Sequence, residues 1–218
     1  MTAYMRWLAD HRGLDLDDYA SLWRWSVEDL EGFWSSIWDY FEVQASPGYE
    51  RPLASRQMPG ARWFPGAQLN YAEHVFRGRD DGETAILHAS ELRDLGELSW
   101  GELREAVARV AASLRGLGVE PGDRVVAYLP NIPEAIIAFL ATASIGAVWS
   151  SCSPDFGADS VVDRFAQIEP KVLFTVDGYR YNGKDFDRMD VVAQLEAELG
   201  PGPLRLEIGP EGRVAKSR

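Results

Sequence analysis

The stretch Arg124–Gly157 restricts the fold more than any other part of the chain. Its first part, Val125–Leu129, is a nearly continuous apolar run, which is typical of a strand that is covered on both faces. An apolar helix follows, which Pro133 opens at a suitable first position and Gly146 ends. Ala147–Cys152 then reads as a second apolar strand. This order predicts a βαβ unit inside a parallel sheet.

Strand and helix signals alternate from residue 84 to residue 199. Ser99 and Glu102 form a capping-box pair, and the apolar residues after them recur at spacings of three and four, which predicts a helix that ends at Gly116. Further strands are predicted at 84–88 and 172–176, and further helices at 159–168 and 189–199. The order βαβαβαβα predicts the α/β class, with a parallel sheet of βαβ units and helices on both faces.

A tryptophan-rich helical segment is predicted ahead of this sheet, within residues 1–45. Ser26 followed by Asp29 resembles a capping box, with Asp in place of the more usual Glu or Gln. Apolar side chains then recur at spacings of three and four, so they share one helical face. Burying side chains of this size is worth roughly 1.5 to 3 kcal/mol each, so we expect packing within the protein, with a surface for an aromatic ligand or partner as the alternative. The residues of this stripe are Leu30, Phe33, Trp34, Ile37, Trp38 and Phe41.

Charge and composition exclude several classes of function. The net charge of the 218 residues is −12 and the basic residues are scattered, which argues against nucleic acid and anionic membrane surfaces as partners. The longest apolar stretch, Ala135–Trp149, is interrupted and shorter than the roughly 20 residues of a membrane-spanning helix. The first residues lack the pattern of a secretory signal, and the single cysteine, Cys152, fits a reducing compartment. These features predict a cytoplasmic protein.

One segment matches the spacing of a phosphate-binding P-loop but not its chemistry. Gly178, Gly183 and Lys184 fit the spacing, yet Asp185 stands where a P-loop has Ser or Thr. We expect a turn there, either one that contacts another anion through its basic residues or a plain surface turn. His11, His74 and His88 share no ligand spacing with Cys, Asp or Glu, so no metal site is predicted. Cys152 ends an apolar strand without an evident base beside it, so it is expected to be buried rather than nucleophilic.

Three stretches resemble the acyl-CoA synthetase branch of the adenylate-forming enzymes. They are WFPGAQLNYAEH (Trp63–His74), the long segment Leu98–Gly157 and YNGK (Tyr181–Lys184). Within that family, SSCSPDFG and NYAEH are similar to the members that activate acetoacetate. The resemblance implies a division into a helical N-terminal segment of the acetyl-CoA-synthetase type with a linker (1–62), an N-terminal α/β subdomain (63–199) and an irregular tail (200–218).

The resemblance also implies an activity for the complete enzyme. It would convert acetoacetate, ATP and CoA to acetoacetyl-CoA, AMP and pyrophosphate, with Mg²⁺. The threonines Thr2, Thr84, Thr142 and Thr175 stand alone, so the family's Thr- and Ser-rich phosphate loop is not recognised, and we expect that loop and the catalytic Lys beyond Arg218. No catalytic residue is therefore predicted here. ATP, Mg²⁺ and CoA are expected to bind the complete enzyme but none of them tightly to these residues, with a complementing C-terminal part of the ligase as a possible partner.

One binding site is implied by the same resemblance. In related synthetases the loop after the strand that matches 172–176, together with residues near the end of the strand that matches 147–152, lies close to the CoA nucleotide. The implied CoA-binding residues are Arg180, Tyr181, Asn182, Gly183 and Lys184 and, on weaker grounds, Ser150 and Ser151.

Two alternatives stay open on the sequence. One is a part of an acetate or propionate ligase, since the carboxylate pocket of the family is formed mostly by other residues. The other is a nucleotide-binding or interaction module that keeps the scaffold without the chemistry.

Overall fold

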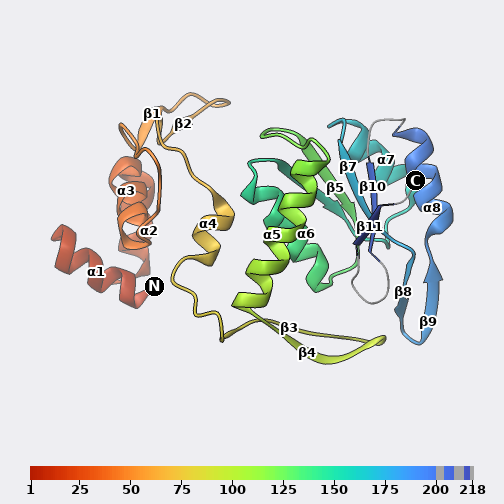
Figure 1. Ribbon diagram of the computed structural model, residues 1–218. Helices are drawn as coiled ribbons and strands as arrows, with labels where there is room; N and C mark the ends of the chain where they lie inside the picture. Colours follow the sequence, from red (N-terminus) through yellow and green to blue (C-terminus); the bar gives the residue numbers. More distant parts are fainter. Residues whose placement is uncertain (200–203, 209–213, 217–218) are drawn as a thin grey trace. The chain divides into compact units, whose positions relative to one another are not determined.

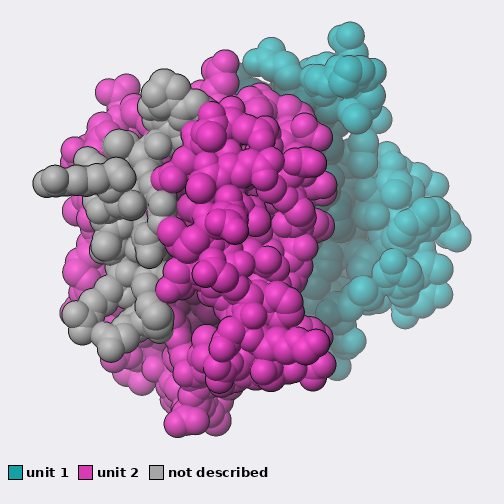
Figure 2. Space-filling model, turned by 90° about the vertical axis from the view of Figure 1, so that its right-hand side faces the viewer, with its two compact units in different colours: residues 1–70 teal, residues 71–218 magenta. Residues whose placement is uncertain are grey.

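The computed structural model describes residues 1–199, 204–208 and 214–216. The chain divides into two compact units, Met1–Asn70 and Tyr71–Arg218, which Figure 2 colours separately. Each unit is described by itself below.

The first unit is helical, as predicted, but its helices start at other caps. Asp18 caps the second helix through a capping box with Ser21, and Asp29 caps the third by accepting from the Gly32 N–H at 2.9 Å. The predicted capping box of Ser26 with Asp29 is therefore wrong, because the Ser26 hydroxyl donates to the Trp23 carbonyl at 2.7 Å while a new helix begins after Asp29. The elements are α1 (Thr2–Arg12), α2 (Tyr19–Glu28), α3 (Leu30–Tyr40) and a short antiparallel pair, β1 (Leu53–Ser55) with β2 (Arg62–Trp63).

The predicted apolar stripe of α3 is packed only in part. Phe33 and Ile37 pack on the small core of this unit, and Trp38 lies against Tyr49 with the ring centroids 4.8 Å apart. Trp34 and Phe41, however, are 40% and 53% exposed. The expectation that the stripe packs within the protein is thus met by its inner members, whereas its outer members keep much of their surface in water.

The second unit is built on a mixed sheet whose central strands are buried on both faces. Its strand order is β11-β10-β7-β5-β6, and β5, β6, β7 and β10 run parallel. Val125 and Ala127 of β5 face one apolar cluster, whereas Val126 and Tyr128 face the other. Since successive side chains of a strand point to opposite faces, the continuous apolar run is explained by two-sided burial. The strands are β5 (Arg124–Tyr128), β6 (Val148–Cys152), β7 (Val172–Val176), β10 (Leu204–Ile208) and β11 (Val214–Lys216).

Helices cover the two faces of this sheet, as Figure 1 shows. The cluster on one face contains side chains of α5 and α6, and the cluster on the other contains side chains of α7 and α8. The predicted caps hold at α5, where the Ser99–Glu102 capping box forms, and at α6, which begins at Pro133. The helices are α4 (Tyr71–Phe76), α5 (Trp100–Gly116), α6 (Pro133–Ser144), α7 (Ala158–Ala166) and α8 (Met189–Glu198), and none of the helices in the described part of the chain is long and apolar enough to cross a membrane.

The strand predicted at 84–88 exists but does not belong to the parallel sheet. It is part of β3 (Thr84–Ser90), which pairs antiparallel with β4 (Arg93–Ser99) in a separate two-stranded sheet. The sequence hides this hairpin because its tip, Glu91–Leu92, has no Gly, Asn or Asp to signal a tight turn. Arg93 anchors the hairpin to α6, since its NH1 donates to both carboxylate oxygens of Glu134 at 2.8 and 3.0 Å.

The segment expected to be an irregular tail contributes two strands to the sheet. β10 pairs in parallel with β7, and β11 pairs antiparallel with β10. The alternating segment LRLEI at 204–208 was the available signal for a strand.

Asp123 and Lys171 form an ion pair at the end of the sheet where β5 and β7 begin. The Lys171 ammonium donates to the Asp123 carboxylate at 2.7 Å and to the Gly118 carbonyl at 2.5 Å. The Glu120 N–H also donates to the Asp123 carboxylate, at 2.8 Å. The hydrogen bond from Lys171 lowers the pKa of Asp123 below its ordinary value, so the carboxyl titrates at a lower pH in the folded protein than in the unfolded chain.

We predict that Asp123→Asn lowers the free energy of unfolding at about pH 7 and that the difference from wild type shrinks as the pH falls below about 4. A carboxyl with a lowered pKa stabilises the fold above its ordinary pKa and loses that contribution as the pH falls through its folded value. Urea unfolding at several pH values measures this, with Asp163→Asn on the exposed side of α7 as the charge-matched control. A difference that persists unchanged in acid would contradict the prediction.

Candidate functional site

The five residues predicted around the CoA nucleotide lie together in one β-hairpin. β8 (Gly178–Tyr181) pairs antiparallel with β9 (Lys184–Asp187), and Tyr181 lies opposite Lys184. Asn182 and Gly183 form the tip, with φ angles of 52° and 71°. Two successive residues with positive φ make the type I′ turn that Asn-Gly favours between paired strands. The segment with P-loop spacing is therefore a hairpin, and the rejection of the P-loop is confirmed.

Arg180 is held by a carboxylate of the opposite strand. Its Nε and NH2 donate to the two oxygens of Asp185 at 2.6 and 2.8 Å. This bidentate pair raises the pKa of Arg180 and lowers the pKa of Asp185. Lys184 makes no ion pair with a described side chain, so its charge is the more available of the two to a ligand.

The base of the hairpin is tied to the loop after β6. The Tyr179 hydroxyl donates to the Asp155 carboxylate and accepts from Arg188 NH2 at 3.0 Å. The rings of Tyr179 and Phe186 stack with centroids 5.1 Å apart, and the Arg188 guanidinium lies over both rings. The bond to Asp155 raises the pKa of Tyr179, and the same bond lowers the pKa of Asp155. Sequence reasoning missed Asp155 and Arg188, although Asp155 lies in the SSCSPDFG segment that carried the resemblance.

The tip of the hairpin contacts the tip of the β3–β4 hairpin. The N–H groups of Asn182 and Gly183 donate to the two carboxylate oxygens of Glu91 at 2.5 and 2.7 Å. The sequence gives no signal for this contact, because Glu91 lies 91 positions from Asn182 and carries no motif.

Ser150 and Ser151 lie apart from the hairpin contacts. They sit within the edge strand β6, opposite Val126 and Ala127 of β5. No hydrogen bond between described residues joins either serine to the hairpin, and the contact from this side comes instead from Asp155.

Metal and nucleophilic chemistry find no support among the described residues. Within that part of the chain, no group of three or more His, Cys, Asp or Glu side chains could hold a metal ion. Cys152 is buried, as expected, and burial raises the pKa of its thiol, which disfavours the nucleophilic thiolate.

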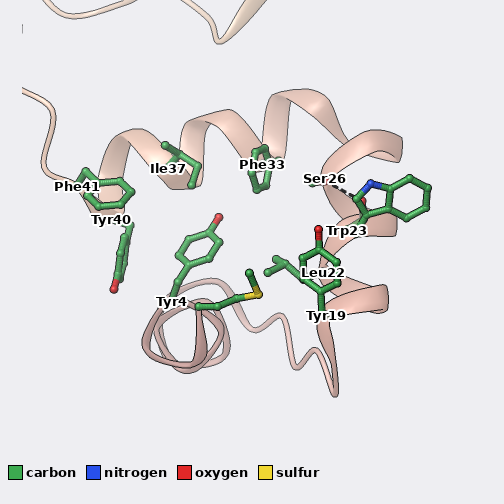
Figure 3. A pocket seen from close by; sticks show the side chains of 10 residues that line it. Tyr4, Tyr19, Leu22, Trp23, Ser26, Phe33, Ile37, Tyr40 and Phe41 are labelled. Carbon is green, nitrogen blue, oxygen red and sulfur yellow. Dashed lines mark hydrogen bonds between the residues drawn. The ribbon is translucent and has the colours of Figure 1, made fainter. Parts of the chain in front are cut away.

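The helical unit contains a hollow of about 450 Å³ between α1, α2 and α3. Figure 3 shows Tyr4 of α1 in this hollow, with Phe33 and Ile37 on α3 and Leu22 on α2 around it. The Tyr4 hydroxyl is hydrogen-bonded to Ser36 Oγ at 2.5 Å, and burial raises its pKa. None of the side chains that line the hollow carries a charge. If the apolar stripe of α3 is a surface for an aromatic ligand or partner, the alternative named in the sequence analysis, this hollow is the place for that contact.

We predict that Gly178→Ala disrupts the β8–β9 hairpin. A Cβ at Gly178 would lie 2.5 Å from the Phe186 carbonyl oxygen, and backbone cannot move aside as a flexible side chain can. Hydrogen exchange of the hairpin amides should accelerate, while amides of β5 keep their protection. Gly116→Ala is the matched control because a Cβ there meets open space, and unchanged exchange in Gly178→Ala would contradict the prediction.

Comparisons with known proteins give consistent results for both parts of the chain. Residues 19–75 match the family model for the acetyl-coenzyme A synthetase N-terminus, and residues 77–209 match that for AMP-binding enzymes. The acetoacetyl-coenzyme A synthetase of Rhizobium meliloti (strain 1021) is 42% identical over 197 residues, which cover 90% of this chain and 30% of that protein. The acetoacetyl-CoA synthetase of Danio rerio is 44% identical over 181 residues, which cover 82% of this chain and 27% of that protein.

A solved structure is similar over nearly the whole chain. The acetoacetyl-CoA synthetase from Streptomyces lividans is 52% identical, with a TM-score of 0.93 over 99% of this chain and 34% of that chain. This chain therefore spans about a third of the length of the relatives it matches. It belongs to the AMP-binding enzyme family and is a homologue of the N-terminal part of acetoacetyl-CoA synthetases.

Proposed function

We propose that this chain is the N-terminal part of a cytoplasmic AMP-forming ligase that converts acetoacetate, ATP and CoA to acetoacetyl-CoA, AMP and pyrophosphate. The observation that carries the proposal is the identity of 42% to 52% with proteins named acetoacetyl-CoA synthetases. Because the matches span about a third of those proteins, the reaction is proposed for a polypeptide that also carries the remaining parts of such a ligase.

The proposed reaction has two steps. A carboxylate oxygen of acetoacetate bonds to the α-phosphorus of ATP, and pyrophosphate leaves with the electron pair of the broken P–O bond. The thiol of CoA then loses its proton to water and its sulfur bonds to the acyl carbon, while the bond from that carbon to the phosphate oxygen breaks and AMP leaves with the electron pair. We assign to residues 1–218 the scaffold and a part of the CoA site, and we place ATP and Mg²⁺ on other parts of the ligase.

The β8–β9 hairpin is the proposed contact for the CoA nucleotide. It follows the carboxyl end of β7 after a single residue, and open parallel sheets bind ligands at the carboxyl ends of their strands. Lys184 offers a charge for a phosphate, and Tyr181, which is 69% exposed, offers a ring face. Arg180 contributes more weakly because Asp185 already holds it. Ser150 and Ser151 are proposed as CoA contacts only on the weaker grounds of the family resemblance.

We predict that a chimera in which this chain replaces the matching segment of the Rhizobium meliloti relative is active. It should exchange pyrophosphate into ATP in the presence of acetoacetate within about tenfold of the parent rate, since the two scaffolds are 42% identical. The 218-residue chain alone is the control and should give no exchange, because we place the groups that stabilise charge at the α-phosphate on other parts of the ligase.

Two outcomes of this experiment would contradict the proposal. A folded but inactive chimera would favour a non-catalytic nucleotide-binding or interaction module. A chimera that prefers acetate or propionate to acetoacetate, where the parent enzyme does not, would favour an acetate or propionate ligase.

We predict that Lys184→Ala in the chimera weakens CoA about tenfold or more and leaves pyrophosphate exchange nearly unchanged. A charge-assisted hydrogen bond to phosphate is worth roughly 1.5 to 3 kcal/mol, and each 1.4 kcal/mol is about tenfold in affinity. Partial reactions measured at varied CoA separate the two effects. Arg109→Ala, the same change of charge on the exposed side of α5, is the control. Loss of exchange with an unchanged affinity for CoA would show that the hairpin serves ATP instead.

A further inference from the structure

Two hairpins that are distant in the sequence meet at their tips. In Figure 1 the free ends of β3–β4 and β8–β9 lie side by side. The contact consists of the Glu91 carboxylate, whose Oε1 accepts from the Asn182 N–H at 2.5 Å and whose Oε2 accepts from the Gly183 N–H at 2.7 Å. One carboxylate thus satisfies both amide groups of the turn.

The β8–β9 hairpin does not pair these two amide groups within its own strands. The strands pair through Tyr181 and Lys184 on either side of the tip, so the N–H groups of Asn182 and Gly183 have no partner in the ladder. With φ angles of 52° and 71°, both residues are left-handed, and successive N–H groups of such a turn form a concavity for an anion. The acceptor bound there is an anion, as this chemistry favours.

The charges around the tip match an anion of higher charge than one carboxylate. Lys184 follows the turn directly and has no described ion-pair partner. Arg180 lies in the same hairpin, and its pKa is raised mainly by Asp185 with a smaller contribution from Glu91, so the Glu91 charge lies within reach of that guanidinium. Glu91, Asn182, Gly183 and Lys184 are all exposed, so the carboxylate can leave the turn for water.

We propose that the Asn182–Gly183 turn is a phosphate-binding site and that Glu91 is its built-in occupant, which an incoming phosphate group must displace. The identification of that phosphate as one of CoA rests on the proposed function. A phosphate monoester brings more negative charge to the two amides and to Lys184 than the carboxylate does. Glu91 therefore weakens the binding of phosphate-bearing ligands and keeps the turn amides paired in their absence.

The test uses the ¹⁵N-labelled 218-residue chain and its Glu91→Gln variant. Without ligand, the Asn182 and Gly183 amides of Glu91→Gln should exchange with solvent faster than in wild type. Titrations with inorganic phosphate and with CoA should then shift these two amides at lower ligand concentrations in the variant, with affinities about three- to tenfold tighter. Asp94→Asn is the control, since it removes the same charge from the same hairpin, and it should change the affinities less than about twofold.

The outcomes test separately whether the turn is an anion site and whether CoA is its ligand. Faster exchange and tighter phosphate binding in Glu91→Gln support the site, and tighter CoA binding as well supports CoA as its ligand. Tighter phosphate binding with no response of either protein to CoA would remove CoA from the hairpin and leave the anion site standing. Three results would overturn the proposal. Unchanged amide exchange would mean that Glu91 does not occupy the turn, and an equal gain in affinity in Asp94→Asn would mean that Glu91 acts only through its general negative charge. Weaker phosphate binding in Glu91→Gln would mean that Glu91 helps to bind the phosphate.

Discussion

Burial of β5 on both faces is the constraint on which the rest of the second unit depends. Its alternate side chains belong to two separate apolar clusters, so the strand is stable only between two layers of helices. Both strands that pair with it, β6 and β7, run parallel to it, so the carboxyl ends of the three strands lie at one edge of the sheet. The loop after β6 and the hairpin after β7 emerge there together, which is why Asp155 and Tyr179 can be hydrogen-bonded.

A chain of contacts runs from this core to the base of the hairpin. The buried Tyr128 hydroxyl donates to the Pro154 carbonyl at 2.8 Å and so fixes the loop that carries Asp155. Asp155 accepts from Tyr179, and Arg188 covers the rings of Tyr179 and Phe186. The stiff part of the candidate site is thus its base, whereas its tip reaches away from the sheet and is held by exposed groups.

Sequence reasoning succeeded where signals are local. The Ser99–Glu102 cap, the Pro133 helix start and the two-sided burial of β5 each depend on neighbouring residues and were predicted correctly. The strand at 84–88 was given the wrong partner because the Glu91–Leu92 tip carries no turn residues. The Asn182–Gly183 turn was readable as a hairpin signal, but its contact with Glu91 is long-range and no spacing rule could reveal it.

The acidic composition of the chain affects anion binding at the tip of the β8–β9 hairpin. A net charge of −12 opposes the approach of any anion, so binding depends on a few local groups. Glu91 already occupies the turn amides and Asp185 already holds Arg180, so an approaching ligand finds only part of the hairpin's donors free. A small monoanion gains little by exchanging with a carboxylate of equal charge. A ligand that brings a more highly charged phosphate together with further contacts to Lys184 and Tyr181 gains more, so the paired tip favours large phosphorylated ligands over simple anions.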